Sequence, residues 1–183
     1  SVEGFVQYLD NLVRPSDSLA SDSGDGSIGR SFFDSDMEGR AFGAEVLIRK
    51  EFGEWVYGWL SYTLSRSERL RPPKGWGTFE LDQTHVLNLA WTFRLGNEWS
   101  LGTRFQLSSG NPYYPIVDAR YDAGRDEFVP IYAAESSRIQ VYHRLDLRID
   151  KTWRFDDWMF ELFLDIQNVY NAQNPETPRY SYD

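Results

Sequence analysis

The stretch that decides the fold runs from His143 to Asn171 and reads HRLDLRIDKTWRFDDWMFELFLDIQNVYN. Apolar and polar side chains alternate along its first half, and they alternate again after the acidic pair at residues 156 and 157. A period of two residues is typical of a β-strand with two unlike faces. The stretch therefore predicts two antiparallel strands, near residues 141–154 and 158–169, joined by a short turn.

The same alternation recurs along the rest of the chain, and helical periodicity is nearly absent. The strand expected from Trp55 onwards is less regular, because Tyr57 and Trp59 share a face with hydroxyl side chains. The other strands are expected at residues 5–11, 41–52, 55–66, 84–95 and 99–109. The sequence thus predicts an all-β fold, an antiparallel up-and-down meander of about seven strands that each pair only with sequence neighbours.

The length of the predicted strands and the spacing of their turns favour a membrane. Strands of roughly 10 to 12 residues exceed the usual 5 to 6 of globular sheets, and about ten tilted residues cross a bilayer core. Short connections (52–54, 95–98, 155–157) alternate with long ones (12–39, 67–83, 110–140). This alternation is typical of a large transmembrane β-barrel with short periplasmic turns and long extracellular loops.

Four tryptophans stand at the short turns. Tryptophan is enriched at the interfaces between a membrane and water, so we expect a periplasmic aromatic girdle. Ordinary packing at the ends of hairpins is the alternative. The residues are Trp55, Trp99, Trp153 and Trp158.

Alternation also assigns side chains to the two faces of the predicted barrel. The side chains expected to face lipid are Leu101, Phe105, Leu145, Leu147, Ile149, Phe160, Leu162 and Leu164. Those expected to face the lumen are Arg104, Gln106, Arg144, Asp146, Arg148, Asp150, Glu161 and Asp165. Charge pairing between strands is a simpler role for these carboxylates than acid–base catalysis. A soluble β-sandwich that turns its polar face to water would show the same alternation.

Composition excludes several classes of function. The 183 residues carry a net charge of −9, which argues against a nucleic-acid partner. Aromatic residues make up 16% of the chain, enough for membrane girdles or for the core of a large sandwich. No run of about 18 apolar residues exists, so a transmembrane helix is not expected. The chain has no cysteine, hence no disulfide and no thiolate metal site.

No catalytic residue, cofactor site or metal site is predicted. His85 and His143 are the only histidines, too few for a metal or haem site, and we expect them at strand ends or at the barrel rim. Asp17, Asp22 and Asp25 lie in a Ser/Gly-rich loop whose spacing does not match an EF-hand, so a mobile acidic loop is expected instead of a calcium site.

The segment from Gly110 to Pro115, GNPYYP, marks the start of a long loop, because proline fits there and not in a central strand. Tyr113 and Tyr114 are candidates for contact with a ligand at the outer mouth. Packing within the loop is the alternative role for both.

Three longer stretches resemble the C-terminal barrel strands of TonB-dependent receptors. The features shared with that family are a Gly-x-Glu strand before a Ser-Tyr-Thr strand, an Asp-Gln pair before His-Val-Leu-Asn, and Leu-Asp-Leu-Arg followed by Asn-Val-Tyr-Asn. The stretches are residues 39–68, 79–115 and 143–175.

The resemblance implies a non-enzymatic receptor in the outer membrane of a Gram-negative bacterium. Its function would be TonB-energised uptake of a nutrient such as a siderophore, cobalamin or an oligosaccharide. Its partners would be outer-membrane lipid, the rest of the barrel with its plug domain, TonB, and the small nutrient ligand. A passive porin-like or structural barrel stays open, and so does a soluble carbohydrate-binding β-sandwich.

Two features depart from the family. The sequence shows neither a plug domain nor a TonB box, and it ends in Ser-Tyr-Asp where the family's last strand ends in an aromatic residue. We therefore expect residues 1–183 to be a partial transmembrane β-barrel domain. The plug, the earlier strands and the closing strand would lie outside it.

Overall fold

The computed structural model describes residues 1–15, 33–51, 53–71, 75–124 and 126–174, and this part contains no helix. Its strands are β1 (Val2–Pro15), β2 (Phe33–Lys50), β3 (Val56–Arg71), β4 (Gly75–Thr78), β5 (His85–Gly96), β6 (Trp99–Ser108), β7 (Pro112–Tyr113), β8 (Ile116–Asp122), β9 (Glu127–Tyr132), β10 (Ser137–Arg138), β11 (Tyr142–Arg154) and β12 (Met159–Ile166).

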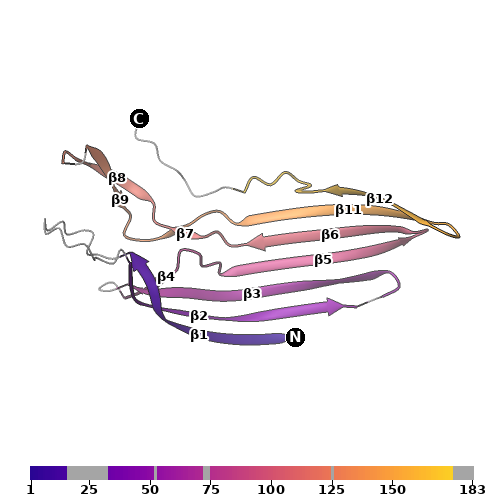
Figure 1. Ribbon diagram of the computed structural model, residues 1–183, viewed down its shortest axis with the longest axis horizontal. Coiled ribbons are helices and arrows are strands. Elements are labelled where there is room, and N and C mark those ends of the chain that lie inside the picture. The colour runs from indigo at the N-terminus through magenta and orange to yellow at the C-terminus, as the bar shows by residue number, and fades with distance from the viewer. Residues whose placement is uncertain (16–32, 52, 72–74, 125, 175–183) are drawn as a thin grey trace.

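Seven long strands form one antiparallel sheet in the order β1-β2-β3-β5-β6-β11-β12 (Figure 1). Each long strand therefore lies beside the next long strand of the chain, and β1 and β12 stand at the two ends of the order. The all-β antiparallel sheet of about seven strands is confirmed. The boundaries of β5, β6 and β11 fall within one residue of the prediction, because apolar alternation marks these strands from end to end.

The pairing of β1 with β2 extends further than the sequence predicted, since β1 continues to Pro15 and β2 begins at Phe33. An ion pair holds this extension together. Arg14 donates from Nε to Asp36 Oδ1 at 2.7 Å and from Nη2 to Asp36 Oδ2 at 3.0 Å. Charged side chains thus support strand pairing where the apolar alternation has ended. The prediction of a loop throughout residues 12–39 was therefore wrong at both ends.

The long connections at residues 67–83 and 110–140 also contain strands, although the sequence predicted loops there. The strand β4 pairs with the end of β3, β7 pairs with β10, and β8 pairs with β9 in a separate hairpin. The strands β7 and β10 have two residues each, too few to show any periodicity. The hairpin β8–β9 contains a register shift, which breaks the alternation that would have marked it.

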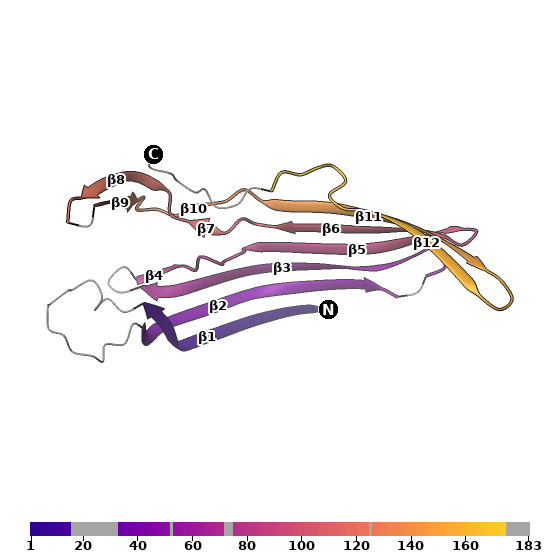
Figure 2. The ribbon, with the colours of Figure 1, turned by 45° about the horizontal axis from the view of Figure 1, so that its top comes forward.

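The strand ends that short connections join and those that long connections join lie at opposite ends of the sheet, as Figures 1 and 2 both show. Asn97 and Glu98 form the tightest short connection, with φ values of 49° and 59°, after Gly96 at 86°. Positive φ at both central residues fits the twist of a two-residue hairpin. The described strands of the long connections, β4, β7 and the β8–β9 hairpin, lie toward the other end (Figure 1).

The sheet has no apolar core among the described residues. No Val, Leu, Ile, Met or aromatic side chain there is buried, whereas the polar side chains Asp82, Ser109 and Asp146 are. Soluble domains gain most of their stability by burying apolar surface. Among the described residues, no element covers the apolar side chains of this sheet.

Candidate functional site: the two faces of the sheet

The register of the strands gathers the predicted lipid-facing side chains. Leu101 lies opposite Ile149, which lies opposite Leu164 on the next strand. Phe105 in turn lies opposite Leu145. Because directly opposed residues share a face of the sheet, one apolar face results. The predicted residues on it are Leu101, Phe105, Leu145, Leu147, Ile149, Phe160, Leu162 and Leu164.

The opposite face is polar, and Asp146 lies at its centre. Arg104 donates to Asp146 Oδ2 from Nε at 3.0 Å and from Nη2 at 2.7 Å. Arg144 Nη2 lies 3.0 Å from the same oxygen, and the backbone N–H of Asn168 donates to Oδ1 at 3.0 Å. Asp146 is only 5% exposed, so two guanidinium groups and one amide replace its water.

A second ion-pair cluster continues along β11 and β12. Arg148 donates from Nε to Asp150 Oδ1 at 2.7 Å, and its Nη2 lies 3.4 Å from Glu161 Oε1. Arg148 also lies opposite Asp165 in the register, and its guanidinium carbon is 4.0 Å from the centre of the Phe163 ring. Gln106 lies opposite Arg144, which completes the predicted polar set on this face. Glu161 holds the Arg148 guanidinium across the β11–β12 pair, whereas Asp150 holds it within β11.

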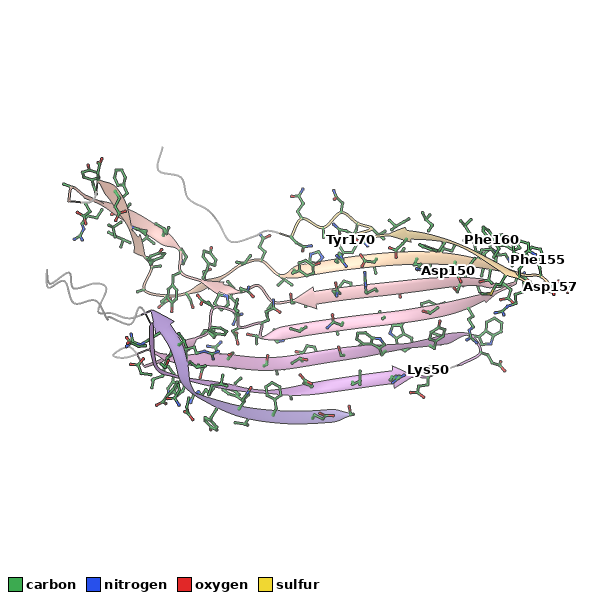
Figure 3. All side chains as sticks on the ribbon, viewed as in Figure 1. Lys50, Asp150, Phe155, Asp157, Phe160 and Tyr170 are labelled. Carbon is green, nitrogen blue, oxygen red and sulfur yellow. The ribbon has the colours of Figure 1, made fainter. Side chains whose placement is uncertain are left out.

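All four predicted girdle tryptophans lie at the short-turn end of the sheet, where Figure 3 also places Phe155, Asp157 and Phe160. Trp153 lies opposite Phe160 with ring centres 5.5 Å apart. Trp158 stacks on Phe155 at 4.0 Å, and Trp99 lies opposite Lys151. Trp55 accepts a backbone hydrogen bond from Arg94 and, like Trp99, lines a hollow at this end of the sheet.

Lys151 is a functional candidate that sequence reasoning missed. It interrupts the apolar face, where it lies opposite Trp99 and Leu162. Its ammonium group is 5.5 Å from the ring centres of both Trp99 and Trp153, and it donates to the carbonyl oxygen of Asn97 in the short β5–β6 turn. A lysine between two tryptophans at the end of an apolar run was the available signal, because lysine at such an end reaches for the polar boundary.

Histidine–tyrosine pairs stand at the other end of the apolar face. His85 Nδ1 is 2.8 Å from the Tyr62 hydroxyl, and His143 Nδ1 is 2.8 Å from the Tyr170 hydroxyl. In each pair the rings are stacked, at 6.2 and 5.5 Å. The described residues contain no cluster of three groups that could hold a metal ion. Each histidine lies at the beginning of a long strand, His85 on β5 and His143 on β11.

The least exposed side chain among the described residues, Asp82, lies beyond this end of the sheet and was also missed. Arg138 donates to Asp82 Oδ2 at 2.5 Å, to the Asp82 carbonyl oxygen at 2.9 Å and to Thr84 Oγ1 at 2.9 Å. The backbone N–H of Ser67 donates to Asp82 Oδ1 at 2.6 Å. We call Asp82 and Arg138 the latch, because they join the connection between β3 and β5 to that between β6 and β11. Their separation of 56 positions in the sequence hides this contact from sequence reasoning.

The candidate ligand residues Tyr113 and Tyr114 lie next to this latch. Tyr113 belongs to β7 and pairs with Ser137 of β10, next to Arg138. Tyr114 is 39% exposed. The acidic loop with Asp17, Asp22 and Asp25 lies outside the described residues.

Comparison of the chain with protein-family models, with curated proteins and with solved structures finds no match. In the described ranges, no helix is long and apolar enough to cross a membrane.

Proposed function

We propose that this chain forms part of the wall of a large outer-membrane β-barrel, with its apolar face in lipid and its polar face toward the lumen. The height of the apolar face carries the proposal. His143 and Trp153 bound it on β11, and ten residues at about 3.3 Å each, tilted by roughly 40°, rise about 25 Å. An apolar band about 25 Å tall between aromatic girdles is the pattern of transmembrane barrels.

The absence of an apolar core among the described residues supports lipid as the cover. A second sheet packed on this face would make a soluble sandwich, yet the described long strands belong to a single sheet in sequence order. The connections fit the same geometry, since short turns at one end and long connections at the other suit two different compartments (Figure 1). In this arrangement, further strands of the barrel pair with the outer edges of β1 and β12.

The transport activity that we propose is TonB-energised uptake of a scarce nutrient. Its support is the order and spacing of the motifs in residues 39–68, 79–115 and 143–175, which resemble TonB-dependent receptors. The nutrient, a compound such as a siderophore, cobalamin or an oligosaccharide, would meet the outer loops near Tyr113 and Tyr114. A passive or structural barrel would share the wall but would not need an energised inner membrane.

Spin labels in the intact, membrane-inserted protein test the assignment of the faces. One set of single variants replaces Leu101, Leu147 or Leu162 of the apolar face by a cysteine that carries a nitroxide. The other set replaces Arg104, Arg148 or Glu161 of the polar face in the same way. We expect collisions with lipid-soluble oxygen to be frequent for the first set and rare for the second. Equal oxygen accessibility of the two sets would overturn the proposed wall.

Uptake of radiolabelled nutrients by cells with and without TonB tests the transport activity separately. We expect accumulation against a gradient only in cells that have both TonB and a proton gradient. Equal, non-accumulating entry in both strains would establish a passive pore with the same wall.

A further inference from the structure

Both connections that the latch joins contain backbone hydrogen bonds of their own. Between β3 and β5, the Phe79 N–H donates to the Ser67 carbonyl oxygen, and the Asp82 N–H donates to the Phe79 carbonyl oxygen, both at 2.9 Å. Between β6 and β11, the Ile139 N–H donates to the Asn111 carbonyl oxygen at 3.1 Å. Each connection therefore has a local order of its own next to the latch.

Arg138 spans the two connections with one guanidinium group. Its Nη1 donates to the Asp82 carbonyl oxygen at 2.9 Å, and its Nη2 donates to Asp82 Oδ2 at 2.5 Å and to Thr84 Oγ1 at 2.9 Å. Within its own connection, Nη1 also donates to the Gly110 carbonyl oxygen at 3.0 Å. A planar fork of N–H groups can serve acceptors on both sides at once, which a compact ammonium group cannot.

Asp82 accepts this bridge in a site that is closed to water. Its side chain is 1% exposed, while that of Arg138 is 32% exposed. Asp82 Oδ1 accepts from the Ser67 N–H at 2.6 Å, and Oδ2 accepts from the Thr84 hydroxyl at 3.1 Å. Removal of the guanidinium group would leave a buried carboxylate without the cation that it contacts. Opening the latch therefore costs more than breaking an exposed ion pair.

Gly110 fixes the backbone beside the latch. A Cβ at this position would lie 1.9 Å from the Ile139 carbonyl oxygen and 2.9 Å from that of Gln140, closer than a side chain allows. Only glycine therefore lets the chain before β7 pass so near to the chain after β10. The close approach ties the pair of β7 and β10 to the latch, since Arg138 also bonds to the Gly110 carbonyl oxygen.

The strands β7 and β10 connect the latch to the candidate ligand residues. Arg138 lies opposite Pro112, which is buried, and the next residue of β7 is Tyr113. Tyr114 follows directly in the sequence. A displacement of Arg138 would thus move the segment that carries both tyrosines.

We propose that the latch makes two segments, residues 79–84 and residues 110–114 with 137–139, open as one cooperative unit. While the latch is closed, neither segment leaves its place without breaking the contacts of the other. The inference goes beyond the proposed function and holds whether or not the apolar face meets lipid. One consequence does rest on the proposed function: a nutrient bound at Tyr113 and Tyr114 would also alter residues 79–84.

Hydrogen exchange at single amides of the intact protein tests the coupling. The reporters are the amides of Phe79 and Ile139, because each bonds within its own connection and neither donates to a latch residue. We expect Arg138→Met to accelerate exchange at Phe79, in the other connection. We expect Asp82→Asn to accelerate exchange at Ile139. Each acceleration should be about ten- to hundredfold, as for other buried polar groups that lose a partner.

Two controls separate coupling from a general loss of stability. Arg120→Met removes an exposed arginine of β8 in the same connection and should leave both reporters unchanged. The amides near Leu89 and Phe105, which lie opposite each other on β5 and β6, should keep their protection in all variants. Acceleration confined to the connection that carries the substitution would overturn the coupling. Equal acceleration near Phe105, or an equal effect of Arg120→Met, would overturn it as well.

The double variant Asp82→Asn/Arg138→Met gives an independent test. If the two residues act through each other, it should exchange no faster than the single variant with the larger effect. Accelerations that multiply would reveal two separate contributions and would overturn the coupling.

Arg138→Lys keeps the charge and guards against a variant that fails to fold. We expect an acceleration of about three- to tenfold at Phe79, because one ammonium group cannot serve all the acceptors of Arg138. Exchange at the rate of the unchanged protein would contradict the bridging role of the guanidinium group.

Discussion

Leu147 and Arg148 are neighbours in β11, yet they meet opposite surroundings. Arg148 finds its partners within the chain, in Asp150, Glu161 and the ring of Phe163. Leu147 lies opposite Thr103 and Ile166, which are themselves only partly covered. On the polar face charged side chains pair with one another, whereas the described residues leave the apolar face uncovered.

The largest expected effect is that of Leu147→Arg. An arginine near the middle of a lipid-facing strand costs about 2 to 4 kcal/mol. The matched variant Arg148→Leu should cost less, because on the proposed wall this position faces the lumen and loses mainly its pairing with Asp150 and Glu161. The measurement is the free energy of folding into lipid vesicles for both variants.

The opposite ranking would break the comparison of the two faces. If Arg148→Leu destabilises the folded protein far more than Leu147→Arg does, the faces have been exchanged. A harmless Leu147→Arg would place this face in water.

A smaller effect is expected for Asp146→Asn on the polar face. The amide fills the same space but leaves Arg104 and Arg144 without a carboxylate, which should lower the free energy of unfolding by about 1 to 3 kcal/mol. Asp157→Asn, in an exposed short turn, is the control and should change little (Figure 3). Equal values for the two variants in urea unfolding would show that the ion pairs of the polar face add no stability.

Lys151→Ala should have a smaller effect still, because this lysine lies at the boundary of the apolar face. The variant loses the contacts with Trp99 and Trp153, about 0.5 to 1 kcal/mol. Lys50→Ala, at the same end of the sheet, is the control (Figure 3). Folding into vesicles should be weakened only by Lys151→Ala, and an equal effect of Lys50→Ala would assign the loss to charge alone.

The smallest effect concerns pH and the exposed extension of β1 and β2. The hydrogen bond from Arg14 lowers the pKa of Asp36 below its ordinary range. A lowered folded-state pKa means that the pair supports the extension above about pH 4 and loses this support as pH falls through the lowered pKa. Hydrogen exchange of the amides near Arg14 should accelerate in that window, and Asp36→Asn should remove the pH dependence. A pH profile unchanged by Asp36→Asn would show that another group titrates.

The sequence could predict those parts of the fold that depend on apolar alternation. The strands β5, β6 and β11 alternate along their whole length, so their ends and the composition of both faces followed from the residues. The ion pair between Arg14 and Asp36 could not be predicted, because it acts where the alternation has ended. Nor could the position of Lys151, since only the register shows that its ammonium group lies between two tryptophan rings.

The sequence predicted which side chains lie on each of the two faces, but it could not predict how they are arranged in space. Alternation placed Asp146 and Arg148 on one face, but the hollow beside them arises from small residues on the next two strands, Gly102 on β6 and Ala90 on β5. The aromatic side chains of Tyr57 and Trp59 on this face were visible in the sequence only as an irregularity in the alternation of β3. Both features become interpretable once the register fixes which residues lie next to one another.

The latch has a consequence for the order of folding. All pairs of long strands join neighbours in the chain, so the sheet can grow hairpin by hairpin with modest loop-closure entropy at each step. The contact between Asp82 and Arg138 spans 56 residues and requires β5, β6 and the paired strands β7 and β10 to be in place. We therefore expect it to form late, and protection of the Ser67 amide, which donates to Asp82, should report when the end of the sheet with the long connections is complete.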